Sequence, residues 1–161
     1  MKIFIIITIT CLIFFSMCYL GTGSDEKNIK SYASYPDSIQ KIIHSNEQLN
    51  EKIKTISPII AFLSNVFLFA IVFLITGYLI KETGFKRNFG NILIMGEILN
   101  AFDFIIIDML WWRNSKRVRF SGTENMIEEY KNSKKHFISF IKGIFVFLIV
   151  AIIDGIVLAI I

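Results

Sequence analysis

The feature that most constrains this chain is a long apolar stretch, residues 89–112, that also carries acidic and amide side chains. As a helix rising 1.5 Å per residue, it is long enough to cross the roughly 30 Å apolar core of a bilayer. Ionisable groups at membrane depth are costly and normally face protein or water. The polar members of the stretch are Glu97, Asn100, Asp103 and Asp108. We therefore expect a membrane helix with one polar face turned toward an interior.

Three further apolar runs determine the expected fold class. They cover residues 3–20, about 57–80 and 137–161, and apolar residue types make up 54% of the 161 residues. A soluble domain of this length is rarely so hydrophobic. The sequence therefore predicts an all-α integral membrane bundle with three to four transmembrane segments, a multi-pass protein of the cell membrane.

The first run, within residues 1–23, has two interpretations. Lys2, the apolar run and the small residues Gly21 and Gly23 resemble a secretory signal peptide with its cleavage site. The run is also long enough to be a short, uncleaved transmembrane anchor. Both alternatives place the residues after position 24 outside the cytoplasm.

Residues 24–56 change sharply in composition, with five Lys and five Asp or Glu. We expect a short extracytoplasmic segment here, with an amphipathic helix from Ile39 onward. About 33 residues are too few to bury a core alone, so a catalytic ectodomain is not expected. Ser57 and Pro58 are a typical helix start, and they open the predicted membrane bundle, residues 57–161.

A basic loop, residues 113–136, follows the third span and contains seven Lys or Arg and three Glu. The order of apolar core, aromatic pair and positive charge is typical of a helix leaving a membrane. The loop favours anionic lipid headgroups of the bilayer as partners, and its charge distribution is not that of a nucleic-acid-binding protein. The predicted interfacial anchor comprises Trp111, Trp112, Arg113, Lys116, Arg117 and Arg119.

The orientation of this loop is in conflict with a simple topology. Four spans with a cytoplasmic amino terminus would place the basic loop outside, whereas the positive-inside rule prefers the cytoplasm. The third stretch could be re-entrant, the first run could insert with its amino terminus outside, or the rule could fail. These three explanations remain open at the level of sequence.

Counting from the loop between the last two spans compares the depths of their charged residues. Asp108 is 4 residues before Trp112 and Lys142 is 5 after Phe137, which predicts a structural Asp108–Lys142 ion pair. By the same count Glu97 and Asp154 share a depth, where two acids require a shared proton or a cation between them. The candidate ion, proton or helix-contact site comprises Glu97, Asn100, Asp103, Asp154 and Asn65.

One motif carries a resemblance to known proteins. The pattern Asp103-x4-Asp108-x2-Trp111-Trp112-x3-Lys116-Arg117-x-Arg119-x2-Gly122-Thr123-Glu124 resembles a group of uncharacterised small multi-span membrane proteins of low-GC Gram-positive bacteria. The resemblance covers roughly residues 57–161. It implies a membrane bundle, no established activity, and the acid–tryptophan–basic block as the identifying feature of the group.

Two function classes follow from these patterns. The first is an accessory or scaffold subunit whose polar helix face binds a membrane-protein partner or a second copy of the chain. The second is an ion- or proton-conducting protein with an intramembrane carboxylate site; a pore-forming lysis protein is a weaker third option. No enzyme, cofactor or metal site is expected, because the sequence has no phosphate loop, zinc pattern or nucleophile elbow, and Cys11 and Cys18 lack metal-ligand spacing.

Overall fold

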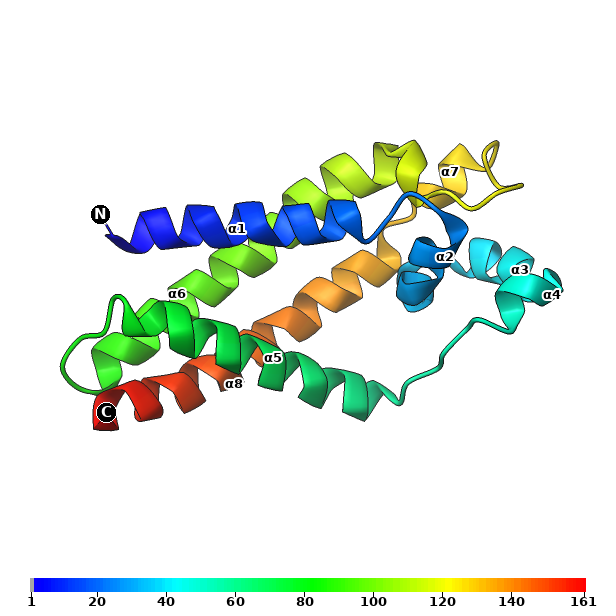
Figure 1. Cartoon of the computed structure of the whole chain (residues 1–161). Helices are drawn as coiled ribbons and strands as arrows, with labels where there is room; N and C mark the ends of the chain where they lie inside the picture. The colour runs from blue at the N-terminus through cyan, green and yellow to red at the C-terminus, as the bar shows by residue number, and fades with distance from the viewer. Residues whose placement is uncertain (1) are drawn as a thin grey trace. The chain divides into compact units, whose positions relative to one another are not determined.

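The computed structural model describes residues 2–161, and this part of the chain is entirely helical apart from turns and loops (Figure 1). Long helices alternate with short ones. The long helices are α1 (Lys2–Leu20), α5 (Pro58–Tyr78), α6 (Phe85–Phe102) with its continuation η2 (Asp103–Trp111), and α8 (Lys134–Ile160). The short ones are α2 (Asp25–Asn28), η1 (Ile29–Ser34), α3 (Asp37–Ser45), α4 (Glu47–Asn50), η3 (Trp112–Asn114), η4 (Lys116–Val118) and α7 (Ile127–Tyr130).

Three helices of the described chain are long and apolar enough to cross a membrane. They are α1, α5 and the stretch Ile127–Ile160, which includes α8. This confirms the all-helical class and the apolar character of three expected spans. The third expected span corresponds to α6 and η2, which together begin at Phe85 and end at Trp111.

The chain divides into two compact units. The first, here called the bundle unit, contains residues 2–12, Ile56–Phe102 and Phe140–Ile161; the second, the aromatic unit, contains Ile13–Thr55 and Asp103–Ser139. This division differs from the sequence-based one at residue 57, because the polar segment after α1 packs with the basic loop and not as an isolated piece.

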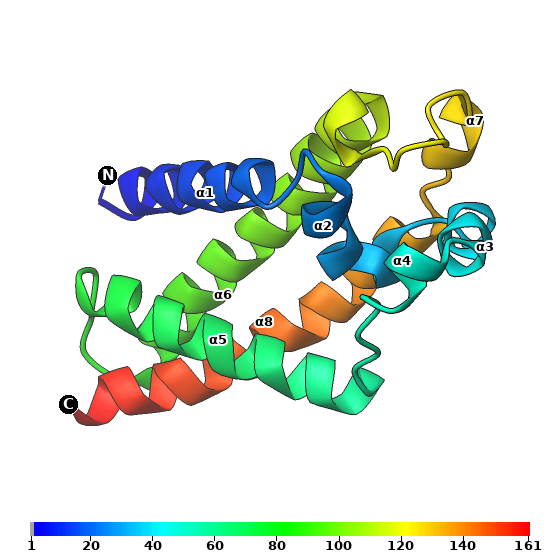
Figure 2. The same cartoon turned by 45° about the vertical axis from the view of Figure 1, so that its right-hand side comes forward.

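Glycines bring the helices of the bundle unit close together. α6 and α8 run in opposite directions (Figures 1 and 2), and a Cβ added at Gly96 would lie only 2.7 Å from the Phe147 ring. Gly143 lies against Asn100 in the same way. Small residues allow close backbone approach, which is the usual basis of helix association in membranes. Further contacts of this unit join Gly155 to Phe89, Gly77 to Ile92 and Leu158, and Phe147 to Phe69 and Phe73.

The aromatic unit has a core built from two separated segments. Tyr35, Ile39 and Ile43 of the first segment pack with Phe120 and Tyr130 of the second, and all five are at most 1% exposed. The Tyr35 hydroxyl donates a hydrogen bond to the Val118 carbonyl over 2.8 Å. Burial raises the pKa of the Tyr35 phenol above its ordinary value, so it remains a donor at any physiological pH. Neither segment is long enough to bury a core by itself, and together they do.

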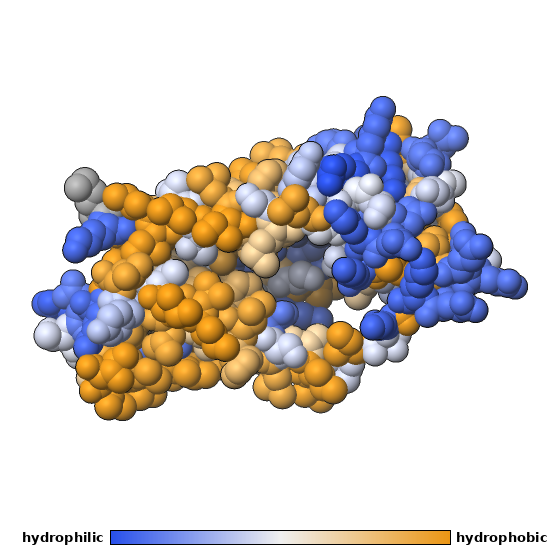
Figure 3. Space-filling view, in the orientation of Figure 1, coloured by the Kyte–Doolittle hydropathy of each residue, from blue (hydrophilic) through white to orange (hydrophobic). Residues whose placement is uncertain are grey.

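Side chains on the surface reflect this division. α5 displays large apolar residues, such as Ile59 and Phe67, each 70% exposed. Figure 3 shows these apolar side chains along α5, and hydrophilic ones over the short helices α3 and α4. An apolar outer surface is costly in water and favourable in lipid.

Candidate functional site

The segment η2, in the aromatic unit, is a nine-residue π-helix that carries Asp103 and Asp108. On an α-helix two residues five positions apart diverge by about 140°. The i→i+5 hydrogen bonding of a π-helix brings such residues onto nearly the same face. Asp103 and Asp108 accordingly interact electrostatically. Stretches of π-helix are rare in proteins and, where they occur, often lie at functional sites. The segment η2 is therefore a candidate functional element.

Asp108 pairs with His136 of α8 through a short contact between oxygen and nitrogen. The Asp108 Oδ1 atom lies 2.8 Å from His136 Nδ1, and the two side chains are 14% and 5% exposed. The structure therefore gives Asp108 a different partner from the expected Lys142, whose side chain is exposed. The partner lies six residues before Lys142, so the antiparallel register is shifted by almost two turns from the one counted from Phe137, and the start of α8 at Lys134 accounts for three of these residues.

The second ring nitrogen of His136 is buried and has no hydrogen-bond partner. An ionised Asp108 accepts the Nδ1 hydrogen, which leaves a lone pair on Nε2 of the neutral ring. The Trp112 ring packs against the imidazole with centroids 4.6 Å apart. A carboxylate-oriented imidazole with a free Nε2 is the arrangement used where histidine accepts and releases protons.

Cys18 of α1 is a further titratable group near this pair. It is a free, half-buried cysteine within electrostatic range of Asp103 and Asp108. Among residues 2–161, no three His, Cys, Asp or Glu side chains are placed to hold a metal ion.

Sequence reasoning assigned no role to His136. The Asn132 side chain accepts from the Lys134 amide, where α8 begins, so His136 lies in the first turn of that helix. Asp108 is 4 residues before Trp112, and the same count from Lys134 reaches Ile138. The pairing of Asp108 with His136 was therefore not recoverable from the helix boundary alone.

In the bundle unit, the polar face of α6 is used for packing within the chain. The Asn100 amide donates to the Phe140 carbonyl over 3.1 Å and lies 3.5 Å from the Glu97 carboxylate. Asn100 is 6% exposed. This part of the candidate site therefore forms a helix contact between α6 and α8.

Glu97 and Asp154 do not share a depth, contrary to the expectation from counting. Because Asn100 lies against Gly143, Glu97 is level with the turn around Val146. Asp154 is eight positions further along α8, or about 12 Å. Asp154 is 1% exposed and its Oδ2 atom has no hydrogen-bond partner, so it is a buried acid with no fixed role.

Asn65 lies apart from these groups. Its side chain on α5 is exposed, whereas Val66 and Phe73 of the same helix are buried. An exposed amide in a membrane span is a common point of contact with another helix. Asn65 is therefore a candidate contact with a molecule other than this chain.

The expected interfacial anchor is largely internal. Trp112 is 6% exposed in the core of the aromatic unit, and Trp111 packs edge-on against Phe15. The Arg117 guanidinium lies 4.1 Å over the Tyr19 ring and donates to the carbonyls of Tyr19 and Thr22. Arg117 therefore caps the end of α1, and Trp112 is part of the core of the aromatic unit. Arg113 and Arg119 are half-buried, and of the six anchor residues only Lys116 is exposed.

Comparison of the sequence with protein-family models, with curated proteins and with solved structures finds no match.

Proposed function

We propose that this chain is a small multi-pass membrane protein that moves protons, and that the Asp108–His136 pair is its proton-binding site. The observation that carries the proposal is the buried, unpartnered Nε2 atom of an imidazole whose other nitrogen is held by a carboxylate. A merely structural histidine would normally have both ring nitrogens bonded, because an unpaired buried polar atom costs stability.

Proton uptake at this pair is inexpensive in electrostatic terms. An isolated charge in a buried site is strongly disfavoured. When Nε2 takes a proton, however, the result is an imidazolium beside a carboxylate, which carries no net charge. The second acid on the same π-helix, Asp103, supplies a neighbouring acceptor for the proton. The loaded pair therefore carries no net charge, and the unloaded pair carries only the single charge of the Asp108 carboxylate.

The core of the aromatic unit supports the proposed multi-pass arrangement. Its two polar segments, residues 24–55 and 113–133, share buried contacts and must lie on the same side of a membrane. The chain leaves the first segment through α5 and returns to the second through α6 and η2. This path requires one membrane crossing in each direction. With α1 and α8, the chain crosses four times, and no re-entrant hairpin is needed.

The same contacts favour retention of α1 as an anchor. The region of the expected cleavage site is folded into the aromatic unit, where Thr22 is 9% exposed and Arg117 lies against Gly23. Removing residues 1–23 would leave the Arg117 guanidinium without its carbonyl partners. We therefore favour the anchor over the signal peptide.

Proton flux into liposomes tests the proposal. The purified chain would be reconstituted with a pH-sensitive dye inside, and flux would be driven by a potassium diffusion potential. Wild-type vesicles should change internal pH faster than empty ones. His136→Asn should slow the flux about 100-fold, because the proton acceptor is lost. Asp108→Asn should slow it as well.

The matched control is His44, the other histidine of the chain. It is exposed and its Nδ1 atom lies 2.7 Å from the Asn50 side chain. His44→Asn should leave the flux unchanged. Equal flux in wild-type and empty vesicles would refute the proposal, as would wild-type flux in a folded His136→Asn variant.

The alternative is an accessory subunit, and the exposed Asn65 on α5 favours it. The polar face of α6 supports this alternative less, because the Asn100 amide already donates a hydrogen bond to the Phe140 carbonyl of the same chain. In that case Asn65→Leu should remove the chain from a larger complex on native gels of its own membranes, while His136→Asn should leave the complex intact.

A further inference from the structure

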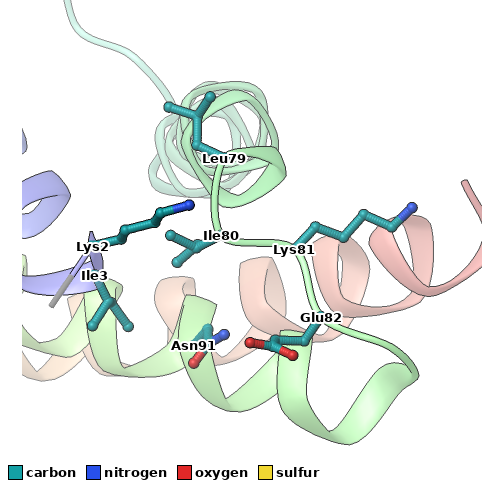
Figure 4. A pocket seen from close by; sticks show the side chains of 7 residues that line it. All are labelled: Lys2, Ile3, Leu79, Ile80, Lys81, Glu82 and Asn91. Atoms are coloured by element: carbon teal, nitrogen blue, oxygen red, sulfur yellow. The ribbon is translucent and has the colours of Figure 1, made fainter.

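The bundle unit contains an open-sided cavity of about 380 Å³ where α5 ends and α6 begins. Its wall includes Lys2 at the start of α1, Ile80 and Lys81 after α5, and Asn91 on α6. Figure 4 shows the Lys2 side chain reaching toward Ile80, and the side chains of Glu82 and Asn91 facing each other. A volume of this size accommodates a small polar group.

Asn88 holds in place the loop after α5, which contributes Glu82 to the cavity wall. This residue is 1% exposed, and its side chain accepts from the Glu82 amide and donates to the Glu82 carbonyl, both over 2.8 Å. It also donates to the Gly84 carbonyl over 3.2 Å. Gly84 has φ +82°, a conformation that glycine adopts readily. The loop is therefore a preorganised element, which lowers the entropic cost of binding.

The charges around the cavity suit an anion. Lys2 and Lys81 are exposed and form no ion pair among the described residues, so both ammonium groups are available. The single acid of the wall, Glu82, lies 3.6 Å from Arg87, which offsets its charge. Asn91 adds an amide that can donate to a phosphate oxygen.

An apolar groove adjoins the cavity. It is lined by Leu74, Ile75, Tyr78 and Leu79 of the α5 end and by Ile161, and Leu79 borders the cavity as well. A polar cavity with basic groups and an apolar groove that share a wall match the two parts of one lipid. The shared wall also lies at the end of α5, a helix apolar enough to span a membrane, which is where headgroups lie.

We propose that an anionic phospholipid occupies this place, with its phosphate at Lys2, Lys81 and Asn91 and an acyl chain along the groove of α5. This assigns lipid recognition to the loop after α5 and not to the basic block 113–119, whose Arg117 and Trp112 serve the core of the aromatic unit. The proposal is independent of proton movement.

Native mass spectrometry of the full chain in detergent tests it. The probe is phosphatidylglycerol, with phosphatidylcholine as the zwitterionic comparison. Wild-type protein should retain one phosphatidylglycerol in preference to phosphatidylcholine. Lys2→Gln and Lys81→Gln should each weaken that binding about fivefold, because a basic residue near anionic headgroups contributes about that much. Leu79→Asn should weaken it by removing the shared apolar wall.

Lys54→Gln provides the matched control, since Lys54 is exposed and lies outside the cavity. It should retain wild-type binding. Equal affinity for the two lipids, or equal loss in Lys54→Gln and Lys81→Gln, would overturn the proposal. Competition by glycerol phosphate as strong as that by phosphatidylglycerol would also overturn it, because the groove would then play no part.

Discussion

The bundle unit and the aromatic unit differ in the composition of both their cores and their surfaces. In the bundle unit, glycines and phenylalanines meet between helices whose outer faces are apolar, as Phe67 and Ile59 are on α5. In the aromatic unit, the core is rich in hydroxyl-bearing rings, such as Tyr35 and Tyr130, and its surface is charged. One unit thus presents an apolar surface, which is favourable in lipid, and the other presents a charged surface, which is favourable in water.

The strongest test of this contrast concerns the side of the membrane. Single cysteines would be placed at Ser45 and Ser121 in a variant without Cys11 and Cys18 and labelled with an impermeant reagent. Because the two positions belong to one folded unit, both should label from the same side, with an all-or-none difference between sides. Labelling from opposite sides would break the aromatic unit apart and restore the re-entrant explanation.

The same labelling decides orientation. Twelve of the 17 Lys and Arg residues lie in the aromatic unit. The positive-inside rule then predicts that both label from the cytoplasm, with the amino terminus outside. Labelling from outside would mean that the signal-like first run dominates insertion.

The second test removes the centre of the aromatic core. Tyr35→Ala should destabilise that unit by about 3–5 kcal/mol, because it deletes a fully buried ring and leaves the Val118 carbonyl unpaired. Unfolding can be followed by tryptophan fluorescence, since Trp111 and Trp112 both belong to this unit. Tyr78→Ala, on an exposed position of α5, is the control and should have little effect.

The third test overpacks the bundle unit. Gly143→Val should cost about 1–3 kcal/mol, because its new side chain would collide with Asn100. Circular dichroism reports the loss of helix on heating. Gly90→Ala is the control, since nothing lies within 4 Å of an added Cβ there. A fluorescence transition that stays at the wild-type temperature would show that the two units unfold separately.

The smallest expected effect is electrostatic. The Lys135 ammonium, 2.7 Å from Asp37, holds the pKa of that exposed carboxyl below its ordinary value. A carboxyl with a lowered folded-state pKa contributes stability above the unfolded-state pKa and loses it as the pH falls through the folded-state pKa. Asp37→Asn should therefore lower the melting temperature by about 2 °C or less at pH 7, and by nothing below about pH 3.

Sequence reasoning located the helices but not the partners of their polar residues. The apolar runs predicted α1, α5 and α8 within a few positions, because a bilayer-length run of apolar residues has few other uses. The polar face of the third span was also visible as a pattern. Its pairing was not, because the count from Phe137 placed the partner of Asp108 at Lys142, six residues beyond His136 on α8.

The π-helical turn shows why such errors arise. On an α-helix, which turns by about 100° per residue, Asp103 and Asp108 point in different directions. The i→i+5 hydrogen bonding of η2 brings them together. Backbone hydrogen bonding of this kind depends on tertiary packing and has no simple residue signature. The aromatic unit was missed for a related reason, since each of its two segments looks too short to fold.

By itself, the sequence determined that the chain is helical, that three of its helices are apolar enough for a membrane, and that acidic groups lie among them. These properties depend on local composition and periodicity, which can be determined directly from the sequence. Tertiary structure alone decided that His136 meets Asp108, that Arg117 closes the end of α1, and that two polar segments share one core. Those contacts join residues far apart in sequence, and only the folded chain establishes which of them coincide.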